Sequence, residues 1–240
     1  SLMREPGHAA EIIAAMARAV KIPVTVKMRK GWDDNELNAG DLARRVEDAG
    51  AKAIAIHGRT AKQSYSGHAD WDFVSAVAQT VSIPVFGSGD CVEPEDIVRR
   101  MQSGVTGVYV GRGVLRNPWI LAQAKDLMAG RPARTVSHEE RGEFLLDYMH
   151  LLLTENIDEA DGFRHAAPVA GGGDRADHRE AVGKERWVIN KIRALCSWYT
   201  KGFDGGAQFR IGVNSAKSIA ELRDLIEQFF MLQPADPLAR

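Results

Sequence analysis

The sequence has few cysteines, little charge imbalance and no long apolar run. Its two cysteines, Cys91 and Cys196, are too few for a disulfide framework or a cysteine-based metal cluster, and no metal site is predicted. The 31 Lys and Arg against 32 Asp and Glu exclude a uniformly basic nucleic-acid binder but permit a local basic face. No segment is long and apolar enough for a membrane helix, and no signal peptide precedes the first amphipathic segment. A cytoplasmic protein without a membrane partner is therefore expected.

The first 130 residues show an alternation of strand and helix patterns. Strand patterns occur at 24–29 and 53–60 and twice between 84 and 113, and helix patterns occur at 7–20, 38–49, 71–80, 93–103 and 119–129. Short connections between such units predict parallel strands with right-handed crossovers. The expected fold class is α/β, with four strands that amount to half of a (β/α)8 barrel. An open flavodoxin-like sheet is the alternative, but it normally begins with a strand and its own phosphate loop.

Polar residues gather where the first two strand patterns end. The first pattern alternates Val24, Val26 and Met28 with Thr25, Lys27 and Arg29, and the second alternates Ile54 and Ile56 with Ala53, Ala55 and His57. A surface strand would alternate in the same way. A barrel strand explains the polar ends better, because that fold carries its chemistry at the carboxyl ends of its strands. A histidine at a strand end is more often structural than a ligand contact, although the small residues before His57 leave room for a flat ligand.

The two strand patterns between 84 and 113 are interpreted as buried strands that each end in a glycine-rich turn. The first turn contains Gly87 and Gly89, and the second contains Gly111 and Gly113. Glycine lets the backbone approach an anion closely, and free N–H groups at such turns suit a phosphate. In a (β/α)8 barrel the usual phosphate site lies between the loops after the seventh and eighth strands. Turns that need glycine only for their geometry are the alternative.

The sequence pattern predicts that residues 131–240 form a separate, all-helical part. Ser137 with Glu140 and Ser218 with Glu221 are capping boxes that open two amphipathic helices. A third helix is predicted at 184–199. Between the first and third helices, residues 158–183 are rich in Gly, Ala, Asp and Arg and are expected to lack fixed structure.

The sequence resembles the tRNA-dihydrouridine synthases of the bacterial B-type branch. The resemblance rests on V-T-V-K-M-R at 24–29, H-G-R-T at 57–60, Y-S-G-H-A-D-W at 65–71, G-S-G-D at 87–90, G-R-G-V-L-R-N-P-W at 111–119 and W-Y-T-K-G-F-D-G-G-A-Q-F-R at 198–210. It covers nearly the whole chain apart from 158–183. It implies a flavoenzyme that reduces uridine to 5,6-dihydrouridine in tRNA, with FMN as cofactor and NAD(P)H as reductant.

The resemblance also implies roles for individual residues. Lys27 and His57 match residues at the flavin ring, where a cation stabilises negative charge on the reduced flavin. Ser88, Gly89 and Asp90 match a phosphate-and-ribityl motif that more often begins with Asn. Gly111 and Arg112 match a second phosphate grip of backbone N–H groups and a guanidinium. Arg29 and Arg59 match positions that meet RNA.

The family's catalytic cysteine has no counterpart at Cys91 or Cys196. The resemblance therefore implies that this general acid and the first four barrel strands lie upstream of Ser1, and that the chain corresponds to strands five to eight and the helical domain. It gives domain bounds of 1–130 for the partial barrel and 131–240 for the helical tRNA-binding domain. Two alternatives remain: a non-catalytic fragment with weak RNA binding, and a phosphate-binding barrel enzyme without flavin.

A basic stretch in the helical part is the candidate RNA face. Residues 184–210 contain six Lys or Arg against two acids, with Trp187, Trp198 and Tyr199 interleaved. Basic groups bind phosphates and exposed aromatic rings stack on nucleotides. Together with the resemblance, this pattern favours RNA contact by Lys191 and Arg193. A solvated basic helix is the alternative, and Trp187 and Trp198 are expected in the core.

Overall fold

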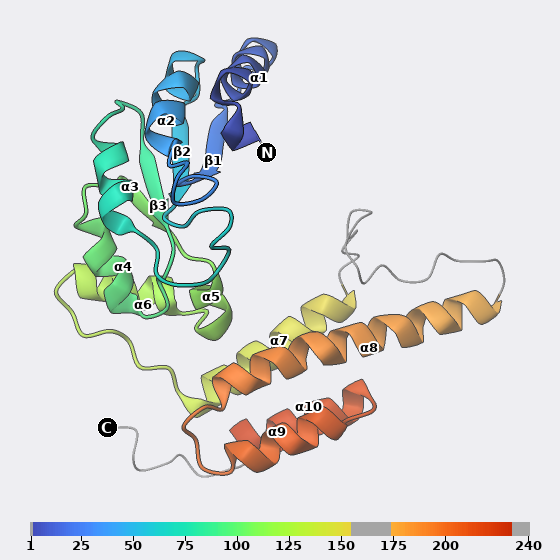
Figure 1. Cartoon of the computed structure of the whole chain (residues 1–240). Helices are drawn as coiled ribbons and strands as arrows, with labels where there is room; N and C mark the ends of the chain where they lie inside the picture. The colour runs from blue at the N-terminus through green and yellow to red at the C-terminus, as the bar shows by residue number, and fades with distance from the viewer. Residues whose placement is uncertain (1, 155–173, 232–240) are drawn as a thin grey trace. The chain divides into compact units, whose positions relative to one another are not determined.

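The computed structural model of the chain describes residues 2–154 and 174–231 (Figure 1). The chain divides into two compact units, residues 1–134 and 135–240. The division lies close to the predicted boundary at residue 130. Each unit has its own apolar core.

The first unit is an α/β layer around a parallel sheet. Its elements are η1 (Leu2–Arg4), α1 (Pro6–Ala19), β1 (Thr25–Arg29), α2 (Ala39–Asp48), β2 (Ala53–His57), α3 (Trp71–Ala78), β3 (Val85–Ser88), α4 (Pro94–Met101), β4 (Gly107–Tyr109), α5 (Arg112–Arg116) and α6 (Ile120–Met128). The four strands are all parallel and follow the order β1-β2-β3-β4. This confirms the predicted α/β class and the parallel sheet.

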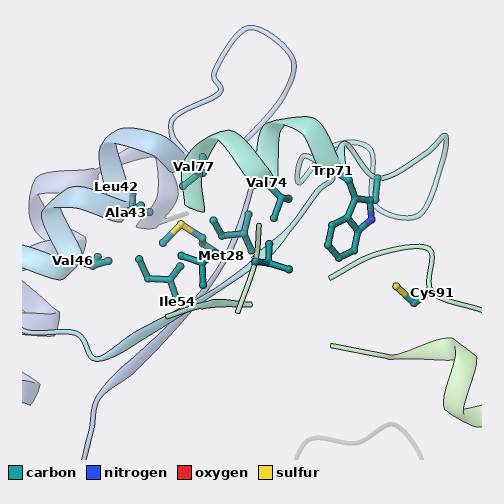
Figure 2. Packing of buried hydrophobic residues seen from close by; sticks show 14 of the residues in the cluster. Met28, Leu42, Ala43, Val46, Ile54, Trp71, Val74, Val77 and Cys91 are labelled. Atoms are coloured by element: carbon teal, nitrogen blue, oxygen red, sulfur yellow. The ribbon is translucent and has the colours of Figure 1, made fainter. Parts of the chain in front are cut away.

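One face of the sheet forms the core of this unit. Met28, Ile54 and Ile56 are buried on it, as their alternation predicts. Leu42 and Val46 of α2, with Val74 and Val77 of α3, lie in the same cluster (Figure 2).

Glycine allows one helix to come especially close to this face. The Trp71 ring of α3 occupies the place where a Cβ on Gly87 would lie. The Trp71 indole also donates from Nε1 to the Gly89 carbonyl at 2.9 Å. The turn after β3 is therefore tied directly to the start of α3.

The opposite face, here called the open face, carries the alternate residues of the four strands. Its members are Thr25, Lys27, Arg29, Ala53, Ala55, His57, Phe86, Ser88, Gly107 and Tyr109. Parallel sheets are usually covered on both faces. Here the Lys27 side chain is exposed and Tyr109 is 47% exposed. The interpretation of the fourth strand pattern as a buried strand is therefore wrong, because β4 is an edge strand whose Tyr109 lies on the open face.

The second unit consists of α7 (His138–Thr154), α8 (Asp174–Tyr199), α9 (Gly206–Ser215) and α10 (Ile219–Phe230). Leu145, Met149 and Leu152 of α7 are buried, as expected for the amphipathic helix that Ser137 opens. Both predicted caps form: Ser137 Oγ accepts from Glu140 N at 3.0 Å, and Ser218 Oγ accepts from Glu221 N at 3.2 Å. None of the helices in the described ranges combines the length and apolarity that a bilayer crossing demands.

Helix α8 begins ten residues before the predicted helix at 184–199, inside the stretch expected to lack fixed structure. The sequence from 174 starts with Asp and continues with Arg, Ala and Glu, which are compatible with a helix and its positive N-terminal end. The preceding part of the predicted unstructured segment, 158–173, lies outside the described residues.

Candidate functional site

The strand register brings the predicted polar residues together at one edge of the sheet. Arg29 pairs with His57, His57 pairs with Ser88, and Ser88 pairs with Tyr109. The next layer towards the amino ends contains Lys27, opposite Ala55 of β2. These side chains belong to the open face. Since neighbouring strands are ~4.8 Å apart, β1 and β4 are separated by roughly 14 Å across the sheet, a span that suits an elongated ligand.

The turn after β3 has a backbone that requires glycine at one position. Gly89 has φ +126°, and a Cβ there would lie 2.5 Å from Ala69 Cβ and 3.1 Å from His57 Cδ2. Asp90 follows with φ 53°, which is also in the left-handed region. The Asp90 carboxylate stabilises this turn by accepting from Ala69 N at 2.6 Å. Consecutive residues with positive φ leave a sharp turn beside the His57 ring.

Arg59 is placed differently from its predicted role at RNA. Its residue is only 2% exposed. The guanidinium donates to Ser66 O at 3.1 Å, to Gly67 O at 2.7 Å and to Asp90 Oδ1 at 2.6 Å. A buried guanidinium with these partners joins the loop after β2 to the turn after β3. This placement leaves it no exposed donor for a phosphate.

Arg29 is likewise occupied by the loop after β2. Its Nη1 donates to Thr60 O at 2.9 Å and to Ser64 O at 3.0 Å. The side chain is half-buried, and Ser64 has φ 50°. Arg29 and Arg59 therefore hold one loop from two sides.

Arg112 is an accessible cation next to the turn after β4. Its side chain is 54% exposed, and its Nη2 lies 3.8 Å from Asp90 Oδ1. The guanidinium carbon lies 4.7 Å from the centre of the Tyr65 ring, in a cation–π contact. At the neighbouring Gly111, a Cβ would meet no atom within 4 Å. Gly111 and Arg112 therefore border open space, as a predicted anion grip requires.

The charges around His57 and Asp90 keep the two groups in fixed ionisation states. Burial, and after it the positive charges of Arg29, Lys27 and Arg59, together lower the pKa of His57 to about 4, against the smaller opposing effect of Asp90. Partial burial acts to raise the pKa of Asp90, but the hydrogen bonds from Ala69 N and Arg59 outweigh it and hold that pKa below its ordinary value. At neutral pH the site thus contains a neutral imidazole beside an ionised carboxylate.

The two predicted RNA contacts on α8 lie in different environments. Lys191 is exposed, and its Nζ lies 5.1 Å above the Trp187 ring. Arg193 instead donates to Val213 O at 2.9 Å, to Ala216 O at 2.6 Å and to Asn190 Oδ1 at 3.2 Å. Val213 and Ala216 lie at the end of α9, where helix carbonyls lack partners of their own. Arg193 is therefore a cap for α9.

The two tryptophans of α8 also differ from each other. Trp187 is partly buried and packs against the core of its unit, as expected. Trp198 was expected in the core but is 41% exposed. Because Trp198 and Lys191 are seven residues apart on one helix, they lie on the same side of α8.

Sequence reasoning missed two residues of the site, Phe86 and Tyr109, which stack on the open face with ring centres 5.3 Å apart. Tyr65, the first residue of the motif at 65–71, had no predicted partner and contacts Arg112. The signal for Phe86 was available, since it precedes Ser88 by two residues and must share its face. The contact of Tyr65 depends on a loop whose path is not encoded by any periodic pattern.

Within the described ranges there is no group of three or more His, Cys, Asp or Glu arranged to hold a metal ion. Both cysteines are buried, and burial raises the pKa of Cys91 to about 11 and that of Cys196 to about 12.

Comparison with known proteins gives one consistent family. The family model described as dihydrouridine synthase (Dus) matches residues 1–172. The chain is 35% identical over 235 residues to a probable tRNA-dihydrouridine synthase of Rickettsia prowazekii (strain Madrid E), covering 96% of this chain and 63% of that protein. It is 44% identical over 156 residues to a probable tRNA-dihydrouridine synthase of Rhodobacter capsulatus, covering 64% of this chain and 48% of that protein.

A third relative carries a more specific name. The chain is 31% identical over 231 residues to tRNA-dihydrouridine synthase B of Pseudomonas aeruginosa, covering 96% of this chain and 62% of that protein. The chain therefore spans less than two thirds of the length of each of these three relatives.

Proposed function

The chain belongs to the dihydrouridine synthase family, and on that premise we propose that it binds FMN on its open face and serves the reduction of uridine to 5,6-dihydrouridine in tRNA. NAD(P)H is the proposed source of reducing equivalents. The observation that carries the proposal is the placement of an accessible guanidinium, Arg112, beside the open space at Gly111, at the same edge of the sheet as His57 and Ser88.

The residues present fit a flavin phosphate and ring. Open space at Gly111 admits an anion, and Arg112 supplies a charged donor with more than half of its side chain exposed. The nearby Asp90 carboxylate would repel a phosphate if it were unpaired, but Arg59 neutralises it at 2.6 Å. Lys27, at the far end of the open face, is exposed and available to a ring system. The roughly 14 Å across the sheet between β1 and β4 suits a ring joined to a phosphate by a chain.

Each residue then has a distinct task. FMN, when bound, would supply the hydride that is added to the uracil ring. Arg112 and the Gly111 backbone hold the phosphate end, and Ser88 offers a hydroxyl near the middle of the open face. Lys27 places a positive charge where the reduced cofactor carries negative charge, which stabilises that state. His57 lies beside the ring end as a neutral imidazole.

The proton for the second uracil carbon must come from another group. Family resemblance assigns it to a cysteine, but Cys91 is buried behind the turn after β3, with its Sγ 3.6 Å from Gly89 O. Cys196 is buried in the helical unit. We therefore assign neither cysteine to catalysis.

We further infer that β1 to β4 correspond to strands five to eight of a (β/α)8 barrel, with the open face on the barrel interior. The helical unit, residues 135–240, is the proposed tRNA platform. On α8 we place the RNA contact at Lys191 and Trp198, because both are exposed on one side of the helix. Arg193, Arg29 and Arg59 are left out of this RNA surface because protein acceptors already hold their guanidinium groups.

The flavin that stays with the protein through purification tests the proposal. Wild-type protein should retain flavin that mass spectrometry identifies as FMN. Arg112→Ala should lower FMN affinity roughly 10- to 100-fold, because each hydrogen bond from a charged donor contributes about 1.5–3 kcal/mol. Arg116→Ala is the matched control, since Arg116 is another exposed arginine of α5 and should leave FMN affinity unchanged.

A second variant tests the other end of the open face. Lys27→Met should leave the phosphate contacts intact but lower the reduction potential of the bound flavin, because a cation that stabilises the reduced form is lost. Spectroelectrochemical titration measures that potential. Protein without flavin affinity, or equal FMN affinity in the Arg112 and Arg116 variants, would overturn the proposed site.

A further inference from the structure

We propose that Arg59 is a positioning residue that fixes His57 as a neutral imidazole with its proton on Nδ1, so that His57 presents a hydrogen-bond donor to the ligand of the open face. Only the identity of that ligand as FMN rests on the proposed function. The tautomer itself is a property of this chain's own residues.

The contact between the two side chains admits one arrangement of protons. Arg59 Nη1 lies 3.5 Å from His57 Nε2. A guanidinium has only N–H donors, so a favourable contact needs a lone pair on Nε2. A proton on Nε2 would set two donors against each other. The single proton of the neutral ring is therefore assigned to Nδ1.

Arg59 cannot easily turn away from this contact. The residue is 2% exposed, and its Nε and Nη2 are directed to Ser66 O, Gly67 O and Asp90 Oδ1. The planar guanidinium holds its five donors in a fixed fork. With Nε and Nη2 engaged, the direction of Nη1 towards His57 is set as well.

The Nε2 edge of the ring is closed, whereas Nδ1 has no hydrogen-bond partner within the described part of the chain. A Cβ at Gly89 would lie 3.1 Å from His57 Cδ2 and 3.3 Å from Nε2, so the Gly89 backbone lies against this edge. The φ of +126° at Gly89 makes a side chain there strained as well. A ligand must therefore meet the ring at its Nδ1 side.

The surrounding charges keep the ring from taking a second proton at neutral pH. Lys27 and Arg29 lie on β1, Arg59 follows β2 and Asp90 follows β3. Three positive charges and burial outweigh the one carboxylate, which itself pairs with Arg59. His57 thus offers one donor at Nδ1 and no acceptor to the ligand.

This arrangement selects the ligand atom that can lie next to His57. A carbonyl oxygen or an unprotonated ring nitrogen accepts from Nδ1–H, and an N–H group at the same place would be left unpaired. The open face therefore favours a ligand that places an acceptor atom beside His57.

Long-range ¹H–¹⁵N correlation of the histidine rings, on protein freed of ligand, tests the proposal. For the resonance of His57, assigned by its loss in His57→Gln, wild type at neutral pH should show an unprotonated Nε2 and a protonated Nδ1. Arg59→Met should lose this pattern and gain a population with Nε2 protonated. Lys27→Met is the control, because it removes a positive charge near the ring without removing the donor to Nε2.

Arg59→Lys is the variant to use if Arg59→Met does not fold. The lysine Nζ can remain beside Asp90 but cannot take the places of both Nη1 and Nη2, so the same change of the His57 tautomer is expected. A wild-type ring protonated on Nε2 or on both nitrogens overturns the proposal, as does an unchanged pattern in a folded Arg59 variant. The expected tautomer in a protein that then fails to bind FMN would support this inference while rejecting the proposed cofactor.

Discussion

Replacing Arg193 with alanine should destabilise the helical unit. Three acceptors lose a charged donor: Ala216 O at 2.6 Å, Val213 O at 2.9 Å and Asn190 Oδ1 at 3.2 Å. Ala216 and Val213 are buried residues at the end of α9, so their carbonyls have few other partners. A hydrogen bond from a charged donor contributes about 1.5–3 kcal/mol when it is buried, but Arg193 is only half-buried and water can replace part of each lost bond, so the total loss should be roughly 2–4 kcal/mol, less than three such bonds in full.

Urea unfolding measures this loss, and hydrogen exchange locates it. Amides of α9 and of the adjoining part of α8 should exchange faster in Arg193→Ala, while those of the first unit should not change. Lys191→Ala is the matched control: an exposed lysine on the same helix should change stability by less than about 0.5 kcal/mol. Wild-type stability in Arg193→Ala together with weaker tRNA binding would refute the capping role and restore Arg193 to the RNA surface.

Three further predictions concern His57, Gly89 and Lys191. The pKa of His57 is lowered from 6.5 to about 4, so between these pH values the unfolded chain takes up a proton that the folded chain does not, and the free energy of unfolding should fall as the pH drops. Urea unfolding should show a smaller dependence of this free energy on pH in His57→Gln. Gly89→Ala should lower the melting temperature, whereas Gly111→Ala, in open space, should not. Lys191→Glu should weaken tRNA binding and reduce its salt slope by just under one unit, with Arg223→Glu on α10 as the exposed control.

Each of these predictions can be contradicted. If stability falls with pH as steeply in His57→Gln as in wild type, a group other than His57 causes the loss. Equal melting temperatures for the two glycine variants would remove the steric argument at Gly89. Equal salt slopes for the Lys191 and Arg223 variants would mean that this side of α8 does not bind RNA.

The order of the elements in the first unit was predictable because it depends on local periodicity. Apolar alternation in β1 and β2 marks the buried face, and short connections leave only parallel pairing. The short helix α5 and the helix α9 were not predicted, since neither follows a strong amphipathic pattern. Burial was least predictable where one face is open: the pattern of β4 gives no indication that Tyr109 is exposed.

Which residues lie in the site was more predictable than what each of them contacts. His57, Ser88, Gly89 and Asp90 meet because the carboxyl ends of neighbouring parallel strands must meet. The role of Arg59 could not be predicted, because it depends on the path of a loop that carries Ser66 and Gly67 back to it. Arg193 is similar, since its acceptors are at the end of another helix, 20 and 23 residues along the chain.

The preference of the protein for FMN over riboflavin is the most direct test of the central claim, because the two ligands differ only by the phosphate that Arg112 and Gly111 are proposed to hold. Fluorescence titration should show that wild type binds FMN roughly 10- to 100-fold more tightly than riboflavin, and that Arg112→Ala loses most of this preference. Equal affinity for the two ligands in wild type, or an undiminished preference in Arg112→Ala, would contradict the account.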